Sequence, residues 1–242
     1  MGRIIIVGDV HGCRKELERL LKRIGLRDED RLVFVGDLVG RGPDTMGVLK
    51  LVRKLGAVVV RGNHEHKLLS FRTARLRGEH REFRMGRSLR EVAARLSSEQ
   101  WSWLASLPLW FDLPEHDLRV VHAGVMPGVA IEATDPNVLL TLRGITDDGL
   151  PSSERGTRPW AESHCGPPHV VFGHNAWIAP QIHPWATGLD TGCVYGGALT
   201  AMVLVPGERI PDVDQRMSVL VSEPSARPYV PIRRETGPSP SG

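Results

Sequence analysis

The amino-acid sequence predicts an α/β fold, in which short buried strands alternate with amphipathic helices. Runs rich in Val and Ile occupy residues 4–7, 32–35 and 58–60, and a Gly follows each run closely. Such short apolar runs are typical of buried strands. Between them, residues 14–24 and 43–55 place Leu and Val at helical spacing. This alternation predicts a layered sheet with helices packed against it.

The length and composition fit one large soluble domain. The 242 residues are 41% hydrophobic and 24% charged, which is ordinary for a globular protein. No apolar stretch approaches the roughly 20 residues that a membrane-spanning helix needs. The three cysteines, Cys13, Cys165 and Cys193, are widely spaced and odd in number. We therefore expect a cytoplasmic protein without a disulfide framework, and a monomer is the favoured state.

A purely helical segment interrupts the strands between His66 and about Ser106. We interpret residues 66–106 as a helical cap inserted over the strand ends. The segment is also basic, because residues 67–95 carry nine Lys or Arg and only three Glu. A solvated helix face and an electropositive surface that attracts a polyanionic substrate are both open interpretations.

Strands resume after the cap and complete the main domain, which we place at residues 1–205. The expected elements are strands at 109–113 and 118–121, a short helix at 137–143, a Gly/Pro/Ser-rich loop at 144–159 and closing antiparallel strands near 182, 188–190 and 199–204. Residues 206–242 are rich in Pro, Ser and Arg, with few core residues apart from 219–221. We expect a partly disordered tail there, with at least the last ten residues disordered.

Polar side chains suited to metal binding follow five of the predicted strands. In layered α/β sheets the residues at strand ends converge on one edge, where binding sites are built. Six side chains have this position: Asp9, His11, Asp37, Asn63, His122 and His174. The sequence therefore predicts a metal site, and a site for two ions in particular.

The donor types limit which metals fit. Carboxylate, imidazole and amide oxygen without thiolate favour Mn²⁺, Fe²⁺, Co²⁺ or Zn²⁺ over a structural, cysteine-bound zinc site. Mn²⁺ is the leading expectation, and Mg²⁺ is a further candidate. Asp37 can bridge two ions with its two oxygens. Two ions about 3.5–4 Å apart can activate water and hold the oxygens of a displacement at phosphorus.

Three residues near the predicted ligands suit the rest of such a reaction. His64 is adjacent to a ligand without being needed as one, so it is the expected general acid for the leaving oxygen. Arg41 lies between two glycines, and its planar guanidinium suits a phosphate. Arg61 either binds phosphate or buttresses the turn that follows it.

Five short motifs carry these residues. They read Asp9-Val-His11-Gly, Gly36-Asp37-Leu-Val-Gly-Arg41-Gly, Gly62-Asn63-His64-Glu65, His122-Ala-Gly124 and Gly173-His174. Over residues 3–205 the chain resembles the phosphoprotein-phosphatase branch of the calcineurin-like metallophosphoesterases. The resemblance implies a four-layer sandwich of two mixed β-sheets flanked by helices, here with the helical cap.

The resemblance also implies a dinuclear metal centre with assigned ligands. One ion would be held by Asp9, His11 and Asp37, and the other by Asp37, Asn63, His122 and His174. His64 would be the catalytic acid and Arg41 a phosphate-binding residue. We expect Asn63 to contact the substrate phosphate as well.

Departures from the protein phosphatases narrow the resemblance. Those enzymes typically carry Asp at position 40, which orients the acidic His, whereas this chain has Gly40. A small residue there, together with residues 189–200, resembles the symmetrical diadenosine tetraphosphate hydrolases. Residues 140–143 resemble their substrate-binding segment, which implies that Arg143 binds substrate. Glu65 departs from them, because many of those hydrolases have Asp after the His.

The leading hypothesis is hydrolysis of dinucleoside polyphosphates, with diadenosine tetraphosphate split symmetrically into two ADP molecules. A hydroxide held between the ions would attack an inner phosphorus, and His64 would protonate the departing ADP. The basic segment 67–95 would bind the far phosphates or nucleoside. The resemblance further implies that RNA with a nucleoside-tetraphosphate cap is a substrate.

Two alternatives remain open on the sequence. A serine/threonine or tyrosine protein phosphatase would use the same metal chemistry and differ only in its pocket. A non-catalytic, metal-dependent module would use the basic cap to contact nucleic acid, but the complete ligand set with His64 favours catalysis.

Overall fold

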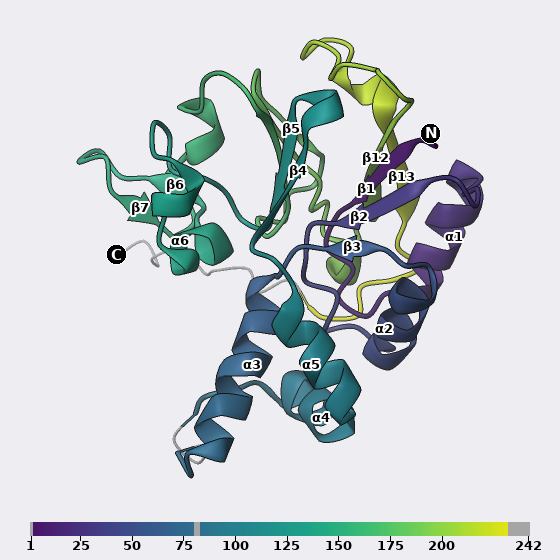
Figure 1. Cartoon of the computed structure of the whole chain (residues 1–242), viewed down its shortest axis with the longest axis vertical. Coiled ribbons are helices and arrows are strands. Elements are labelled where there is room, and N and C mark those ends of the chain that lie inside the picture. Colours follow the sequence, from purple (N-terminus) through teal and green to yellow (C-terminus); the bar gives the residue numbers. More distant parts are fainter. Residues whose placement is uncertain (1, 80–82, 232–242) are drawn as a thin grey trace, which may run out of the picture.

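Two five-stranded β-sheets lie face to face in the computed structural model, and helices flank them (Figure 1). The structure describes residues 2–79 and 83–231. The disorder predicted for the last ten residues lies outside the described residues, as does Arg81 of the basic segment.

The first sheet combines strands from both halves of the chain. Its order is β13-β12-β1-β2-β3. β1 pairs parallel with β2 and antiparallel with β12, so the sheet is mixed. The strands are β1 (Ile4–Val7), β2 (Arg31–Phe34), β3 (Val58–Val59), β12 (Ala198–Leu204) and β13 (Leu220–Pro224).

The second sheet is also mixed, with the order β10-β11-β9-β5-β4. β9 pairs parallel with β5 and β11, while β4 is antiparallel to β5 and β10 is antiparallel to β11. The strands are β4 (Trp110–Leu113), β5 (Leu118–Val121), β9 (His169–Phe172), β10 (Gln181–Ile182) and β11 (Ala186–Gly188). The prediction of closing antiparallel strands near 182 and 188 was therefore only partly right, because β11 also pairs parallel with β9.

Helices α1 (Arg14–Ile24) and α2 (Thr45–Lys54) pack against the first sheet. α1 coincides with the predicted helix and ends at Gly25, which adopts the left-handed conformation common after helices. α2 begins two residues after Pro43, because the Asp44 side chain accepts a hydrogen bond from the backbone N–H of Gly47 at 2.8 Å and caps the helix there.

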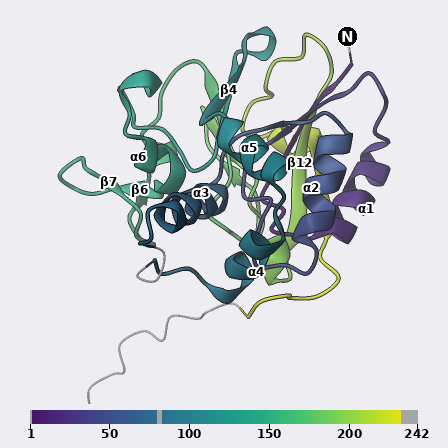
Figure 2. The ribbon, with the colours of Figure 1, turned by 60° about the horizontal axis from the view of Figure 1, so that its bottom comes forward.

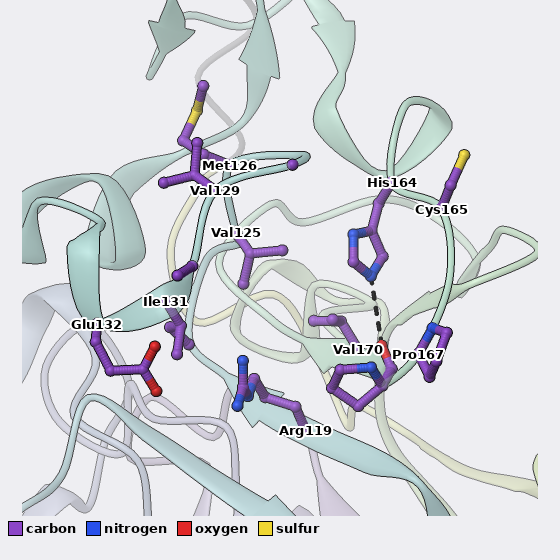
Figure 3. Close-up of a pocket in the computed structure, with 13 residues that line it drawn as sticks. Arg119, Val125, Met126, Val129, Ile131, Glu132, His164, Cys165, Pro167 and Val170 are labelled. Atoms are coloured by element: carbon purple, nitrogen blue, oxygen red, sulfur yellow. Dashed lines mark hydrogen bonds between the residues drawn. The ribbon is translucent and has the colours of Figure 1, made fainter.

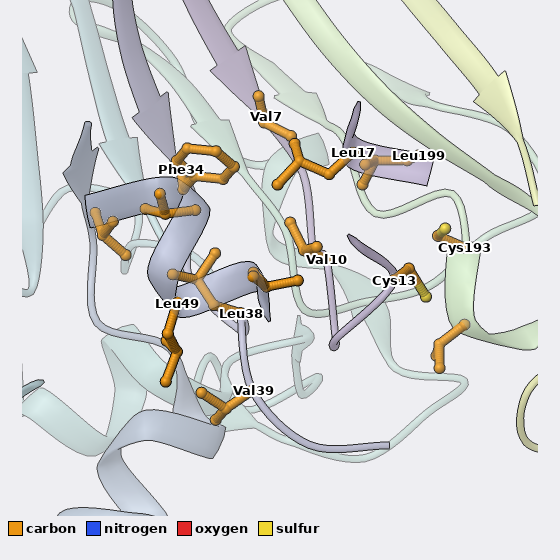
Figure 4. Packing of buried hydrophobic residues seen from close by; sticks show 14 of the residues in the cluster. Val7, Val10, Cys13, Leu17, Phe34, Leu38, Val39, Leu49, Cys193 and Leu199 are labelled. Carbon is orange, nitrogen blue, oxygen red and sulfur yellow. The ribbon is translucent and has the colours of Figure 1, made fainter. Parts of the chain in front are cut away.

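Alternation along β1 divides the core into layers. Ile5 and Val7 pack with α1 and α2 on one face, where Cys13 and Cys193 also meet (Figure 4). Ile4 and Ile6 point the other way and pack between the two sheets. A third cluster, which includes Trp160, covers the outer face of the second sheet. The predicted four-layer sandwich is confirmed.

The segment predicted as a cap consists of three helices joined by short irregular segments in its described part (Figure 2). It contains α3 (Asn63–Leu76), α4 (Arg87–Arg95) and α5 (Ser98–Ser106). α3 begins three residues before the predicted insertion, so Asn63 and His64 form its first turn.

Two segments are more ordered than the sequence suggested. The predicted loop 144–159, which follows α6 (Pro136–Thr141), forms a small sheet of β6 (Gly144–Ile145), β7 (Pro151–Ser152) and β8 (Arg158–Pro159). The segment after residue 205, expected to be a tail, contains β13, which pairs with β12 over five residues. The 3-10 turns are η1 (Pro114–His116), η2 (Ile131–Ala133), η3 (Trp160–Glu162), η4 (Cys193–Tyr195) and η5 (Arg216–Val219).

Candidate metal centre

The six predicted metal ligands come together where strands of both sheets end. Asp9 and Asp37 follow the neighbouring strands β1 and β2, and His122 and His174 follow the neighbouring strands β5 and β9. Asn63 is the first residue of α3, so the helix N-terminus contributes a favourable field for an anion at the same place.

Asp37 is central to the cluster. Its Oδ2 lies 3.4 Å from Nε2 of His11 and 4.0 Å from Nε2 of His64. Its Oδ1 lies 3.5 Å from Nε2 of His122. Two groups of donor atoms result, and within each group all atoms lie within 4.8 Å of one another: His11, Asp37 and His64, and Asp37, His122 and His174. The two oxygens of Asp37 thus face two separate groups.

Backbone carbonyls orient two of the imidazoles. The carbonyl of Val35 lies 2.9 Å from Nδ1 of His122, and that of Val39 lies 3.2 Å from Nδ1 of His11. A carbonyl can only accept, so Nδ1 carries the proton in both rings and each Nε2 presents a lone pair to the cluster. This is the arrangement that a metal-binding histidine needs.

The Asn63 amide lies among the same acceptors. Its Oδ1 is 3.0 Å from Nε2 of His122 and 3.1 Å from Nδ1 of His174. A cation would satisfy these converging lone pairs, and an amide turned by half a rotation would donate to the same atoms instead.

Buried acids favour the cation. Burial, then the nearby carboxylates of Asp190 and Asp37, raise the pKa of Asp9 well above its ordinary value. Burial also raises the pKa of Asp190 to about 6. Burial alone would raise the pKa of Asp37 too, but three neighbouring imidazoles hold it below its ordinary value. Three carboxylates buried together need positive charge, so the residues fit divalent metal ions.

Left-handed backbone is concentrated at this centre. Among the described residues, five non-glycine residues have positive φ, and four belong to the predicted site: His11 (45°), Asp37 (49°), Arg41 (64°) and His174 (67°). Such conformations are costly and are kept where a site requires them. The centre is also crowded at Gly173, where a Cβ would lie 2.0 Å from Oδ1 of Asp9.

Glu65 has a structural place that the sequence did not reveal. Its fully buried carboxylate accepts hydrogen bonds from the backbone N–H groups of Asp37 at 2.9 Å, Gly62 at 3.0 Å and Val39 at 3.1 Å. It therefore joins the loop after β2 to the start of α3.

Leu89 of α4 occupies the space beside Gly40. A Cβ at position 40 would lie 2.9 Å from Cδ2 of Leu89 and 2.9 Å from Nδ1 of His64. Among the described residues, the buried Nδ1 of His64 has no hydrogen-bond partner. Burial lowers the pKa of His64, although Asp37 opposes the shift. Leu89 of the cap thus occupies the space beside His64 and position 40. At that position protein phosphatases carry Asp.

The three predicted phosphate-binding arginines have different surroundings. Nη1 of Arg41 donates to the hydroxyl of Tyr195. Nη2 of Arg61 donates to the carbonyls of Ala105 at 2.8 Å and Leu107 at 2.9 Å, which favours the interpretation that Arg61 buttresses the start of α3.

Arg143 lies on the His174 side of the cluster. Its half-buried guanidinium donates to the carbonyl of Ser153 at 2.6 Å. Burial, then the charges of Arg155 and Arg41, lower the pKa of Arg143. It also acts electrostatically on His174. Arg155, which the sequence analysis missed, therefore adds to the positive charge on this side of the centre.

Two cavities lie elsewhere. One of about 320 Å³ is lined by the outer side of the second sheet and the loops around Met126 and His164 (Figure 3), and none of the six candidate ligands lines it. Its Arg119 is already paired with Asp112 at 2.6 Å. The other, of about 400 Å³, lies in the cap beside Arg72 and Trp101. Arg72 is nine residues after Asn63, about 13 Å along α3, so the α3 part of the basic segment leads away from the candidate ligands, whereas α4 returns to Gly40 through Leu89.

The comparison with protein families is decisive for classification. The model of the calcineurin-like phosphoesterases matches residues 2–178. The chain belongs to the calcineurin-like phosphoesterase family. The match includes all six candidate ligands of this phosphoesterase, as well as His64 and Arg41.

Several curated relatives of this phosphoesterase share one name. This phosphoesterase is 31% identical over 247 residues to the bis(5'-nucleosyl)-tetraphosphatase PrpE (asymmetrical) of Halalkalibacterium halodurans, covering 93% of this chain and 95% of the relative. It is 33% identical over 258 residues to the protein of the same name from a Geobacillus species, covering 97% and 99%. The predicted resemblance to the symmetrical enzymes is not supported, because these relatives are named asymmetrical.

Solved structures agree with the fold. A candidate diadenosine tetraphosphatase has a TM-score of 0.77 and 37% identity, covering 93% of this phosphoesterase and 94% of that chain. A serine/threonine phosphatase from Saccharomyces cerevisiae has a TM-score of 0.59 but only 17% identity, covering 93% and 79%. The second likeness shows the shared fold alone.

No helix in residues 2–79 and 83–231 is long and apolar enough to cross a membrane.

Proposed function

We propose that this phosphoesterase hydrolyses dinucleoside polyphosphates, with diadenosine tetraphosphate as the reference substrate. The observation that carries the proposal is the division of donor atoms around Asp37 into two groups, one of which contains His64, with the charge of Arg41 acting on them. That arrangement supports hydrolysis at phosphorus by two metal ions. The names of the relatives supply the substrate class.

Each residue has a distinct task in this proposal. Asp9, His11 and Asp37 would hold one divalent ion, and Asp37, Asn63, His122 and His174 would hold the other. Two bound ions supply the positive charge that activates water and stabilises the displacement at phosphorus. Arg41 and Arg143 bind phosphate oxygens, and Asn63 contacts the same phosphate. His64 donates the proton on its Nε2 to the departing oxygen. This Nε2 lies 4.0 Å from Oδ2 of Asp37.

The position of cleavage follows the relatives rather than the sequence prediction. We propose asymmetrical cleavage, which yields ATP and AMP from diadenosine tetraphosphate, in place of the symmetrical cleavage to two ADP. Mn²⁺ is the proposed metal, because its preference for oxygen ligands fits the carboxylates and the amide of the site. RNA with a nucleoside-tetraphosphate cap and a cytoplasmic location belong to the same proposal.

Product analysis tests the proposal. The protein is incubated with Mn²⁺ and diadenosine tetraphosphate, and the nucleotides are separated by anion-exchange chromatography. ATP and AMP in equal amounts are expected, while two ADP would overturn the asymmetrical assignment. A phosphopeptide at matched Mn²⁺ is the competing substrate, and a large preference for it in kcat/KM would establish the protein phosphatase instead. Asp37→Asn controls for contaminating hydrolases.

A further inference from the structure

We infer that Tyr195 is a positioning residue for Arg41 and so sets the affinity of the site for substrate phosphate. This inference rests on the proposed function only in treating Arg41 as a phosphate-binding residue. Tyr195 lies on η4, after the second sheet, and is 154 residues from Arg41. The sequence motif around Arg41 does not predict this contact.

Two contacts join the pair. Nη1 of Arg41 donates to the Tyr195 hydroxyl, and the guanidinium carbon lies 5.4 Å from the centre of the Tyr195 ring. The first contact fixes one end of the guanidinium, and the second is within cation–π range. A guanidinium has five N–H donors, so those that do not face Tyr195 stay available to a phosphate.

The backbone of Arg41 is also fixed. It has a φ of 64°, and its N–H donates to the hydroxyl oxygen of Ser88 at 2.8 Å. The side chain itself is exposed. A long exposed arginine loses rotamer freedom when it binds a ligand. Tyr195 removes much of that cost in advance, which is how a positioning residue raises affinity.

The turn that carries Tyr195 is itself rigid. Gly192 and Gly196 flank it with left-handed φ of 69° and 94°, and the Tyr195 N–H donates to the carbonyl of Gly192 at 2.9 Å. The carbonyl of Val194 accepts from the N–H groups of Tyr229 at 2.9 Å and Val230 at 3.2 Å. The N–H of Gly192 donates to the buried Asp190 at 3.0 Å. One turn therefore links the acidic cluster, the phosphate-binding arginine and the C-terminal segment.

A double-mutant cycle tests this arrangement in the whole protein. The unaltered protein is compared with three single variants, Arg41→Ala, Tyr195→Phe and Tyr195→Ala. It is also compared with two double variants, in which Arg41→Ala is combined with each Tyr195 change. The readouts are kcat and KM for diadenosine tetraphosphate and for p-nitrophenyl phosphate, with metal content and thermal unfolding measured in parallel. Tyr229→Phe is the matched control, because it removes the hydroxyl of the chain's second tyrosine, which donates to Glu16 at 2.9 Å.

The expected result is a rise in KM with little change in kcat. We expect about threefold for Tyr195→Phe, which keeps the ring, and about tenfold for Tyr195→Ala. In the Arg41→Ala background neither Tyr195 change adds to the effect, because the residue acts through Arg41. Tyr229→Phe leaves KM unchanged.

Effects that multiply in the double variants, or a KM unaffected by Tyr195→Ala, would overturn the inference. Failure of the proposed function is a separate outcome, in which the protein hydrolyses p-nitrophenyl phosphate but not the dinucleotide. The double-mutant cycle is then measured with p-nitrophenyl phosphate. Calorimetric titration with inorganic phosphate gives the same cycle without turnover, and equal affinities in the unaltered and Tyr195→Ala proteins would also refute it.

Discussion

Glu65 accepts a hydrogen bond from the backbone N–H of Asp37 at 2.9 Å, so a buried carboxylate outside the candidate ligand set holds the residue at the centre of that set. The same carboxylate accepts two more N–H groups, from Gly62 and Val39. Burial, with the charge of Asp37, raises the pKa of Glu65 to about 8. The geometry of the metal centre therefore depends on a residue that is not a ligand.

Glu65→Ala should weaken both the fold and metal binding. It leaves three N–H groups without their acceptor, and each such loss costs about 1–3 kcal/mol. We expect a loss of at least about 3 kcal/mol in unfolding free energy, measured by urea denaturation, with reduced metal content by mass spectrometry. Glu91→Ala, which breaks only an exposed ion pair with Arg87, is the matched control. Equal stability of the two variants would contradict this account.

His64→Gln should separate catalysis from metal binding. If His64 is the general acid, kcat falls by about 10²–10⁴-fold while metal content is unchanged. His64 nevertheless lies in one donor group with His11 and Asp37. Loss of one metal equivalent in His64→Gln would identify it as a ligand instead. His66→Gln, on the same helix, serves as the control and should keep both activity and metal.

Gly40→Asp should not convert this enzyme toward the protein phosphatases. The new side chain would collide with Leu89 and would sit at a φ of 80°. We expect a loss of about 1–3 kcal/mol in stability, together with lower activity. Gly149→Asp isolates the backbone contribution, because Gly149 has a φ of 78° and open space around it. Adding Leu89→Ala to Gly40→Asp should restore part of the activity, and a purely additive loss would argue against the collision.

His169 should make the fold sensitive to mild acid. It is buried, and Nη1 of the equally buried Arg216 lies 3.0 Å from its Nε2. Burial, then the Arg216 charge, lowers the pKa of His169 to about 3. Between its ordinary pKa of 6.5 and this value, the unfolded chain binds a proton that the folded chain does not. Stability therefore falls as the pH falls through that window, by at most about 1.4 kcal/mol per pH unit from this residue.

The variant His169→Gln tests this acid sensitivity, because it keeps an oxygen that can accept from Arg216 and does not titrate. Urea midpoints are measured between pH 7 and pH 4 for both proteins. The variant is less stable at pH 7 and loses less stability on acidification. Identical pH slopes in the two proteins would show that His169 does not carry the effect.

The parts of the fold that the sequence predicted depend on local signals. Strands β1 and β2 are short apolar runs closed by Gly, and the same glycines bring Asp9 and Asp37 to the sheet edge. α1 was predicted to the residue because its apolar spacing and Gly25 agree. Where the local pattern is ambiguous, as in β13 with its Ser222 and Glu223, pairing with β12 decides the structure.

The missed parts of the site depend on contacts distant in sequence. Leu89 reaches Gly40 from the cap, and Tyr195 reaches Arg41 across 154 residues. Neither pair has a spacing that periodicity could reveal. Asp190 is buried in the acidic cluster only because the second sheet brings its turn beside Asp9. The cluster of candidate ligands could thus be predicted from the sequence, but the residues that surround and position it could not.

The strand order of the first sheet has a consequence for synthesis on the ribosome. β1 lies between β2 and β12, and β12 in turn pairs with β13. The strand that precedes Asp9 and His11 therefore lacks one neighbour until nearly two hundred further residues have been made. Pairing over such a separation is slow. One edge of this apolar strand therefore stays unpaired until β12 has been made.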